Sequence, residues 1–337
     1  FKKFRKSQIK TWLFKKNVNS FEKMTNLSKE LKRFLSKKFD INSLEIISKS
    51  KSSDGTNKYL FRLHQGNEIE GVLIPSNNRV TACVSSQAGC SLDCSFCATG
   101  KLDLKKNLDF YEIYEQIFVL NKESHKIYNK NLNNIVYMGM GEPLLNYKNV
   151  IQSIRLACCP NEGLGISPKR ITISTSGISK MIDKLAHENL RCNLALSLHS
   201  ADDEIRSSLM KINDSNNVES LSKSMKYFYE QTKIRPTIEY TLLKGVNDKV
   251  SDNELEEMKK STKMNATKVL NELMTSYNFD VFVSVDNSMA GIAAAAHFPA
   301  LSVPMGYREN GEPSNITFIT RSNNEQLLYN VAYLFEK

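Results

Sequence analysis

The sequence has 337 residues, of which 41% are hydrophobic and 24% are charged, and this composition of a folded protein argues against long disordered regions. Its 46 Lys and Arg exceed its 36 Asp and Glu, and residues 1–60 alone hold 16 basic and 5 acidic side chains, so the whole positive excess lies there. The longest mostly apolar stretch, residues 290–305, contains His297 and Pro299 and is shorter than the ~20 residues of a membrane-spanning helix.

The basic N-terminal part predicts a small helical module over residues 1–58. Its apolar residues recur at helical spacing, with Lys and Arg on the opposite faces. Two interpretations stay open: surface helices with a solvated charged side, or a module that binds the phosphates of a nucleic acid. The apolar residues in question are Ile9, Trp12, Leu13, Leu27, Leu31, Phe34 and Leu35.

The middle of the chain, residues 59–250, alternates strands and helices after an initial strand pair at 59–63 and 69–74. Strands that alternate with crossover helices predict a parallel sheet, either doubly wound or curled into a barrel. Polar clusters follow the strands, at the carboxyl ends where such folds place their chemistry. Strands are expected at 80–85, 135–140, 171–175, 194–198 and 237–243, and helices at 109–122, 147–156, 179–187 and 220–231.

The remainder, residues 251–337, has a different order of predicted helices and strands. It begins with a charged helical stretch, 251–278, and ends with another helix. Between these lie an Ala-rich helix and short strands, so this segment is expected to be α/β as well. The strands are expected at 281–285, 300–305 and 316–320, and the Ala-rich helix at 290–298.

The strongest chemical signal is the cluster Cys90, Cys94 and Cys97 in GCSLDCSFCATG. Three thiols within eight residues bind zinc or an iron–sulfur cluster. A structural zinc ion needs four ligands, and no fourth Cys or His has the required spacing, so a 4Fe–4S cluster with one open iron is favoured. Buried core cysteines are the remaining alternative.

An open iron on a partial barrel suggests S-adenosylmethionine, whose amino and carboxylate groups chelate it. Glu142, at the end of its strand, is suited to hold an ammonium group. Ser174, Ser197 and His199 end other strands and are suited to bind a ribose or a carboxylate. Each of these residues, taken alone, is more often a helix cap or a satisfied polar group.

Five ordered motifs together resemble the radical-SAM adenine-C2 methyltransferases of 23S rRNA and tRNA. The similarity runs from about residue 1 to about residue 250, and its N-terminal part matches the RNA-binding domain of that family. The motifs are CVSSQAGCSLDCSFCATG, YMGMGEPLLN, RITISTSG, ALSLHSADDEIRSSLMKIN and EYTLLKGVND.

The resemblance implies roles for individual residues. Cys83 matches a cysteine that resolves a covalent RNA–enzyme adduct, and Glu70 matches a general base, although the residues alone indicate a core thiol and a solvated strand acid. The implied substrates are 23S rRNA and tRNA, the implied electron donor is a protein such as flavodoxin, and a cytoplasmic monomer is expected. The cluster ligands would be Cys90, Cys94 and Cys97, and the S-adenosylmethionine contacts Gly141, Glu142, Ser174, Ser197, Leu198 and His199.

The chain departs from this family in its C-terminal part. The family carries the methyl group on a C-terminal cysteine and passes through a disulfide, but no cysteine follows Cys192 here. Residues from about 262 onward instead resemble the closing segment of amidase-signature hydrolases, without that family's catalytic serines. We therefore expect impaired methyl transfer, with a metal-stabilised RNA-binding protein or an amide hydrolase fragment as alternatives. Cys158, Cys159 and Cys192 are expected to be structural thiols.

Overall fold

The computed structural model describes residues 4–41, 44–247, 252–285, 288–308 and 313–336, and it divides the chain into two compact units. The first unit is Phe1–Asn247 and the second is Asp248–Lys337. In the described residues, no helix combines the length and the apolar character that crossing a membrane requires.

The N-terminal module is helical up to residue 38. α1 (Phe4–Lys10) continues into a π-helical turn, Thr11–Lys15, and α2 (Lys29–Lys38) follows a short 3-10 turn. The Ser28 hydroxyl caps α2 by accepting a hydrogen bond from the backbone N–H of Leu31. The two helices enclose a small core of their own, which consists of Phe21, Met24, Leu27, Leu31 and Leu35.

The prediction of a helical module that extends to residue 58 is wrong for residues 45–51. They form the strand β1 (Glu45–Lys51), which pairs antiparallel with β2 (Asn57–Arg62). The sequence EIISKSK has too few apolar residues to be recognised as a strand by itself. Its strand conformation depends on hydrogen bonds to β2, a neighbour in the folded sheet.

An eight-stranded sheet organises the first unit, in the order β1-β2-β3-β4-β7-β8-β9-β10. The strands up to β4 pair antiparallel, whereas β4 and the last four strands pair parallel. This mostly parallel open sheet with crossover helices confirms the expected partial (β/α) barrel. The further strands are β3 (Glu68–Ser76), β4 (Arg79–Cys83), β7 (Asn134–Tyr137), β8 (Ile171–Thr175), β9 (Asn193–Ser197) and β10 (Thr237–Glu239).

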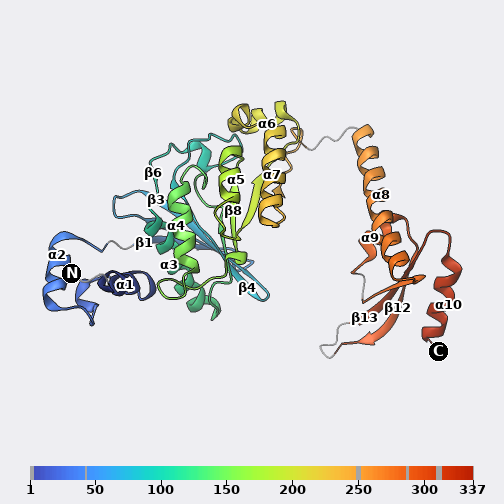
Figure 1. Ribbon diagram of the computed structural model, residues 1–337, viewed down its shortest axis with the longest axis horizontal. Coiled ribbons are helices and arrows are strands. Elements are labelled where there is room, and N and C mark those ends of the chain that lie inside the picture. The colour runs from blue at the N-terminus through green and yellow to red at the C-terminus, as the bar shows by residue number, and fades with distance from the viewer. Residues whose placement is uncertain (1–3, 42–43, 248–251, 286–287, 309–312, 337) are drawn as a thin grey trace. The chain divides into compact units, whose positions relative to one another are not determined.

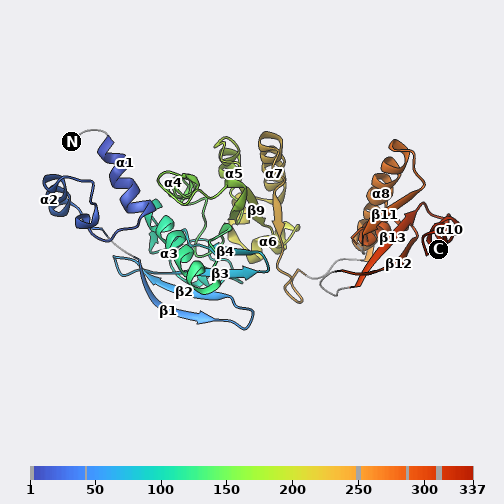
Figure 2. The same cartoon turned by 90° about the horizontal axis from the view of Figure 1, so that it is seen from below.

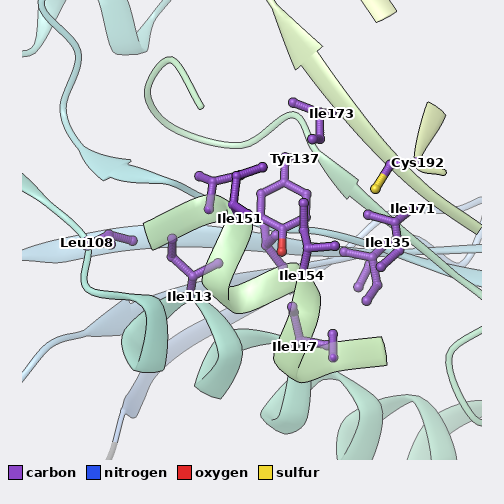
Figure 3. Close-up of a cluster of buried hydrophobic side chains, with 14 of the residues drawn as sticks. Leu108, Ile113, Ile117, Ile135, Tyr137, Ile151, Ile154, Ile171, Ile173 and Cys192 are labelled. Carbon is purple, nitrogen blue, oxygen red and sulfur yellow. The ribbon is translucent and has the colours of Figure 1, made fainter. Parts of the chain in front are cut away.

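Helices cover one face of this sheet, and α4, α5 and α7 lie along the same side of it in Figures 1 and 2. Their apolar side chains meet every second residue of the strands in one buried core. Figure 3 shows this core around Tyr137, Ile135 and Ile171, with Ile151 and Ile154 on the facing helix. The helices are α3 (Phe110–Tyr128), α4 (Tyr147–Cys158), α5 (Ser179–Ala186), α6 (Asp203–Leu209) and α7 (Val218–Thr232).

The opposite face of the sheet carries polar and reactive side chains. Val72 is paired with Cys83, and Ser197 with Glu239. Their neighbours along the strands, such as Ala82 and Leu196, are in the core under the helices, so these side chains point to the side away from the helices. A two-stranded ribbon of β5 (Gln87–Ala88) and β6 (Lys106–Asn107) flanks the cysteine-rich loop.

The second unit contains the predicted tail elements in a separate antiparallel sheet, ordered β11-β13-β12. β11 pairs antiparallel with β13 in this sheet. The elements are α8 (Asp252–Ser276), β11 (Val281–Val285), α9 (Ala290–Ala296), β12 (Ala300–Tyr307), β13 (Pro313–Thr320) and α10 (Glu325–Glu336).

Candidate functional site

A pocket of about 460 Å³ lies at the carboxyl ends of the parallel strands, in the size range of small-molecule sites. Its wall is built by the ends of β7, β8, β9 and β10 with the residues just after them, and by the loop between β5 and β6, as the sequence analysis expected of this edge of the sheet. Leu198 is the one expected cofactor contact outside this wall. The expected residues that line the pocket are Cys90, Cys94, Cys97, Gly141, Glu142, Ser174, Ser197 and His199.

Backbone hydrogen bonds fix the cysteine loop. The N–H of Cys97 donates to the carbonyl of Cys94 at 3.1 Å, which closes a tight turn. Ser95 donates from its backbone N–H to the carbonyl of Leu209 at 2.9 Å, and this bond fastens the loop to the end of α6. A side chain at Gly100 would place its Cβ 2.8 Å from the carbonyl of Cys94, so only glycine permits this packing.

Burial raises the pKa of the Cys90 thiol and raises the pKa of the Cys94 thiol to about 12, and the neighbouring thiols add to both shifts. The free thiols are therefore protonated at neutral pH, and a bound metal must displace their protons. No three Cys, His, Asp or Glu side chains of the described residues converge as they would around a single ion. A cubane cluster binds each thiolate through a different iron, so three spaced thiols on one wall fit it better than they fit a zinc ion.

The loop after β7 approaches the sheet closely because it contains two glycines. A Cβ at Gly139 would lie 2.7 Å from the backbone of Val84. Gly141 has φ +92°, and a Cβ there would lie 2.4 Å from Gln87. The lack of space requires glycine at both positions, and the positive φ is a second reason at Gly141.

The carboxylate of Glu142 is buried and hydrogen-bonded on both oxygens. Oε2 accepts from the backbone N–H and the hydroxyl of Ser176, both at 2.8 Å, and Oε1 accepts from the N–H of Leu144 at 2.9 Å. Burial raises the pKa of this carboxyl, and the hydrogen bonds oppose that shift. In this arrangement Glu142 ties the end of β7 to the end of β8.

Glu239 is a pocket residue that the sequence analysis missed. Its Oε2 accepts hydrogen bonds from the hydroxyls of Ser174 at 2.9 Å and Ser197 at 3.0 Å. It ends β10 as the two serines end β8 and β9, and this shared strand-end position is the signal that was available in the sequence. The two hydroxyl protons are directed to Glu239, so their remaining lone pairs can accept hydrogen bonds from a ligand.

His199 follows β9 in a left-handed backbone conformation, with φ 58°. Its Nδ1 accepts a hydrogen bond from the N–H of Thr241 at 3.0 Å, so in the neutral ring the proton is on Nε2. Burial lowers the pKa of His199, which favours this neutral form. The side chain of Asn247 donates to the carbonyls of His199 and Thr241 and thereby joins the two loops.

Cys83 and Glu70 lie on the same face of the sheet as Ser174 but not in the pocket wall. Cys83 is opposite Val72, and Glu70 is two residues before Val72 on the same strand. Burial raises the pKa of Cys83 to about 11, and its sulfur contacts the backbone of Met138, which does line the pocket. The Glu70 carboxylate forms a 2.7 Å ion pair with Lys58.

All seven cysteines are free in the structure, so the disulfide implied by the family mechanism is not formed. Cys158 ends α4 and Cys192 immediately precedes β9, at the opposite ends of the strands from the pocket. Burial raises the pKa of these two thiols, to about 11 for Cys158 and about 12 for Cys192. They are protonated and unreactive at neutral pH.

A second, apolar pocket of about 440 Å³ lies between the N-terminal module and α3. Phe14 joins the two parts, since its carbonyl accepts a 2.9 Å hydrogen bond from the hydroxyl of Tyr114. Glu115 lines this pocket, and burial raises the pKa of its carboxyl to about 7. This apolar pocket shares no lining residue with the pocket that contains Cys90, Cys94 and Cys97.

Comparison with known proteins gives two family matches. Residues 84–258 match the Radical SAM superfamily, and residues 1–41 match the ribosomal RNA large subunit methyltransferase N-terminal domain. The first match covers more than half of the chain and contains all three cysteines of the loop.

Individual relatives agree with these matches. The chain is 50% identical over 251 residues to "Probable dual-specificity RNA methyltransferase RlmN" of Cytophaga hutchinsonii, with 74% of this chain and 68% of the relative covered. A relative of the same name from Thermotoga neapolitana is 40% identical over 316 residues, 93% of this chain and 87% of its own length. A radical SAM methyltransferase structure from Sphaerobacter thermophilus superposes with a TM-score of 0.69 at 37% identity, over 76% of this chain and 74% of that one. The likeness of the tail to amidases stays a prediction.

Proposed function

We propose, since this chain belongs to the family of radical SAM RNA methyltransferases named RlmN, that its reaction is the methylation of C2 of adenine in 23S rRNA and in tRNA, and that the methyl transfer is impaired in this chain. The observation that supports this proposal is the single pocket that Cys90, Cys94 and Cys97 share with the polar ends of four parallel strands. The exposed Lys and Arg side chains of the N-terminal module are suited to contact RNA phosphates.

The pocket residues divide into two groups by chemistry. The three thiols would hold a 4Fe–4S cluster, which together with S-adenosylmethionine supplies one-electron chemistry when bound. The Glu239 carboxylate suits the positive charge of a sulfonium or an ammonium. Ser174 and Ser197 would accept hydrogen bonds from ligand donors, and Nε2–H of His199 would donate to a carboxylate.

Cys83 and Glu70 are the proposed catalytic residues. At a pKa of about 11 the Cys83 thiol is protonated. A base must therefore remove its proton before the sulfur can attack a covalent adduct. Glu70 lies diagonally across the strand pair on the same face, and its carboxylate would take up a proton from the substrate. This carboxylate also forms an ion pair with Lys58, at 2.7 Å.

Methyl transfer by this chain is proposed to be impaired, because no cysteine follows Cys192 to carry the methyl group. The associated expectations belong to the same proposal: a cytoplasmic monomer that receives electrons from a protein such as flavodoxin. Attachment of a C-terminal segment that contains the family's cysteine should restore methylation.

One anaerobic reaction tests the proposal. Reconstituted protein is incubated with dithionite, S-adenosylmethionine and unmodified bacterial rRNA or tRNA, and mass spectrometry measures 2-methyladenosine and 5′-deoxyadenosine. We expect 5′-deoxyadenosine with little 2-methyladenosine, and both products should be absent with the C94A variant. Abundant 2-methyladenosine would refute the impairment, and the lack of both products would refute the radical activity.

If both products are lacking but the protein still binds RNA tightly, the second candidate function gains support. That candidate is a metal-stabilised RNA-binding protein without catalysis, and the observation that favours it is the missing C-terminal cysteine. A brown protein with visible iron–sulfur absorbance distinguishes a cluster from a colourless zinc site.

A further inference from the structure

Arg206 is the largest fully buried side chain among the described residues, with 0% of its surface exposed. It lies on α6, between the ends of β8 and β9. Burial of a charged group is costly unless another charge compensates it. The groups that contact Arg206 therefore indicate what this buried charge does.

The hydrogen-bond partners of this guanidinium are neutral. Nε donates to the carbonyl of Leu198 at 3.0 Å, and Nη1 donates to Oδ1 of Asn213 at 2.8 Å. Nη2 donates to the carbonyls of Ser176 and Ser197. The guanidinium thus gathers the backbone just beyond two strands whose hydroxyls line the pocket.

No carboxylate within the described ranges forms an ion pair with Arg206. Asp203, on the same helix, attracts it electrostatically, but the Asp203 carboxylate accepts hydrogen bonds from Asn213 and from the N–H of Val218. One positive charge therefore stays buried without a neutralising contact.

This charge lies close to the cysteine loop. The last residue of α6, Leu209, accepts both hydrogen bonds of Ser95, the residue after Cys94. The following residue, Met210, lines the pocket together with the three thiols. Ser176 and Ser197, whose carbonyls accept the hydrogen bonds of Nη2, line the same pocket.

We propose that Arg206 is the buried counter-charge of the iron–sulfur site, and that its positive charge raises the reduction potential of the cluster held by Cys90, Cys94 and Cys97. Three thiolates give the bound cluster a net negative charge, and reduction by dithionite adds one more electron. A fixed positive charge nearby in a region of low dielectric constant favours the reduced form. This inference rests on the cofactor part of the proposed function and not on the RNA substrate.

The test compares three variants of the full chain after cluster reconstitution. R206Q removes the charge and keeps an amide donor, R206K keeps the charge and loses the planar fork, and R155Q is a control at an exposed arginine paired with Glu188. Iron and sulfide content is measured first, and the midpoint potential is then titrated by electron paramagnetic resonance, without RNA.

We expect a more negative potential in R206Q, with R206K and R155Q close to the parent chain. Loss of the cluster in R206Q but not in R206K also supports the role of the charge. An unchanged potential in R206Q, an equal shift in R206K, or loss of the cluster in both Arg206 variants would overturn the inference. A parent chain that takes up no iron would overturn the cluster assignment itself, whereas a failure to methylate RNA would leave the potentials as measured.

Discussion

The carboxylate of Glu142 accepts two hydrogen bonds from Ser176, both at 2.8 Å, across the carboxyl ends of two neighbouring parallel strands. This contact holds the loop after β7 against the loop after β8. Both oxygens of this buried carboxyl have hydrogen-bond partners in the protein, so a residue that the sequence analysis connected with ligand binding has a structural role as well.

Replacement of Glu142 by alanine should therefore destabilise the first unit. The variant leaves the N–H groups of Ser176 and Leu144 buried without acceptors, at a cost of about 1–3 kcal/mol for each unsatisfied group. Urea unfolding followed by circular dichroism should show the loss. E219A, at an exposed acid that pairs with Lys223, should remain within about 0.5 kcal/mol of the parent chain. Equal stability of the two variants would contradict this reading of Glu142.

Removal of a single thiol from the loop should abolish cluster binding. We expect C94A to retain little iron after reconstitution, since each thiolate would hold a separate iron of the cluster. C192A, at a buried thiol on the other side of the sheet, should keep the iron and sulfide content of the parent chain. Iron analysis and visible absorbance measure both, and full occupancy in C94A would rule out the assigned ligand.

Substitution of Glu239 should weaken the binding of S-adenosylmethionine. E239L removes the acceptor for the Ser174 and Ser197 hydroxyls together with a negative charge in the pocket. A loss of about tenfold in affinity, or about 1.4 kcal/mol, is expected in equilibrium dialysis with cluster-loaded protein. The S174A/E239L double variant should lose less than the sum of the two single losses, because both residues act in one contact. Additive losses would show that Glu239 acts independently.

The buried carboxyl of Glu115 predicts a dependence of stability on pH. Its pKa is about 7 in the folded protein and 4.5 in the unfolded reference, so the folded state binds more protons between these values. Stability should therefore fall as the pH rises from about 4.5 to about 7, and no further above that. The fluorescence of Trp12, the chain's one tryptophan, reports urea unfolding of the adjoining module. E115Q should weaken this dependence, and an unchanged profile would exclude Glu115 as its source.

Apolar periodicity predicted most of the fold. The parallel strands and most of their crossover helices were expected within a few residues of their observed bounds, because every second residue of a strand under the helices is apolar, as Ile171 and Ile173 are in β8. One exception is β1, whose polar sequence folds as a strand through its pairing with β2. Another is the short helix α6, for which the sequence analysis expected no helix. β10 is also shorter than expected, since only Thr237–Glu239 pairs with β9.

The site was predicted in part for a similar reason. Cys90, Cys94 and Cys97 are close in sequence, and their chemistry is visible in their spacing alone. Arg206 and Asn247 could not be found in this way, because an arginine on a short helix and an asparagine in a loop are ordinarily solvated. Their burial results from strand ends that meet only in the folded sheet.

The position of Asn247 has a consequence for the rim of the pocket. Its side chain donates hydrogen bonds to the carbonyls of His199 and Thr241, two residues of the pocket wall, and so holds the last residue of the first unit at the rim of the pocket. Both hydrogen bonds lie within the first unit, so they fix this part of the pocket rim whatever sequence follows Asn247.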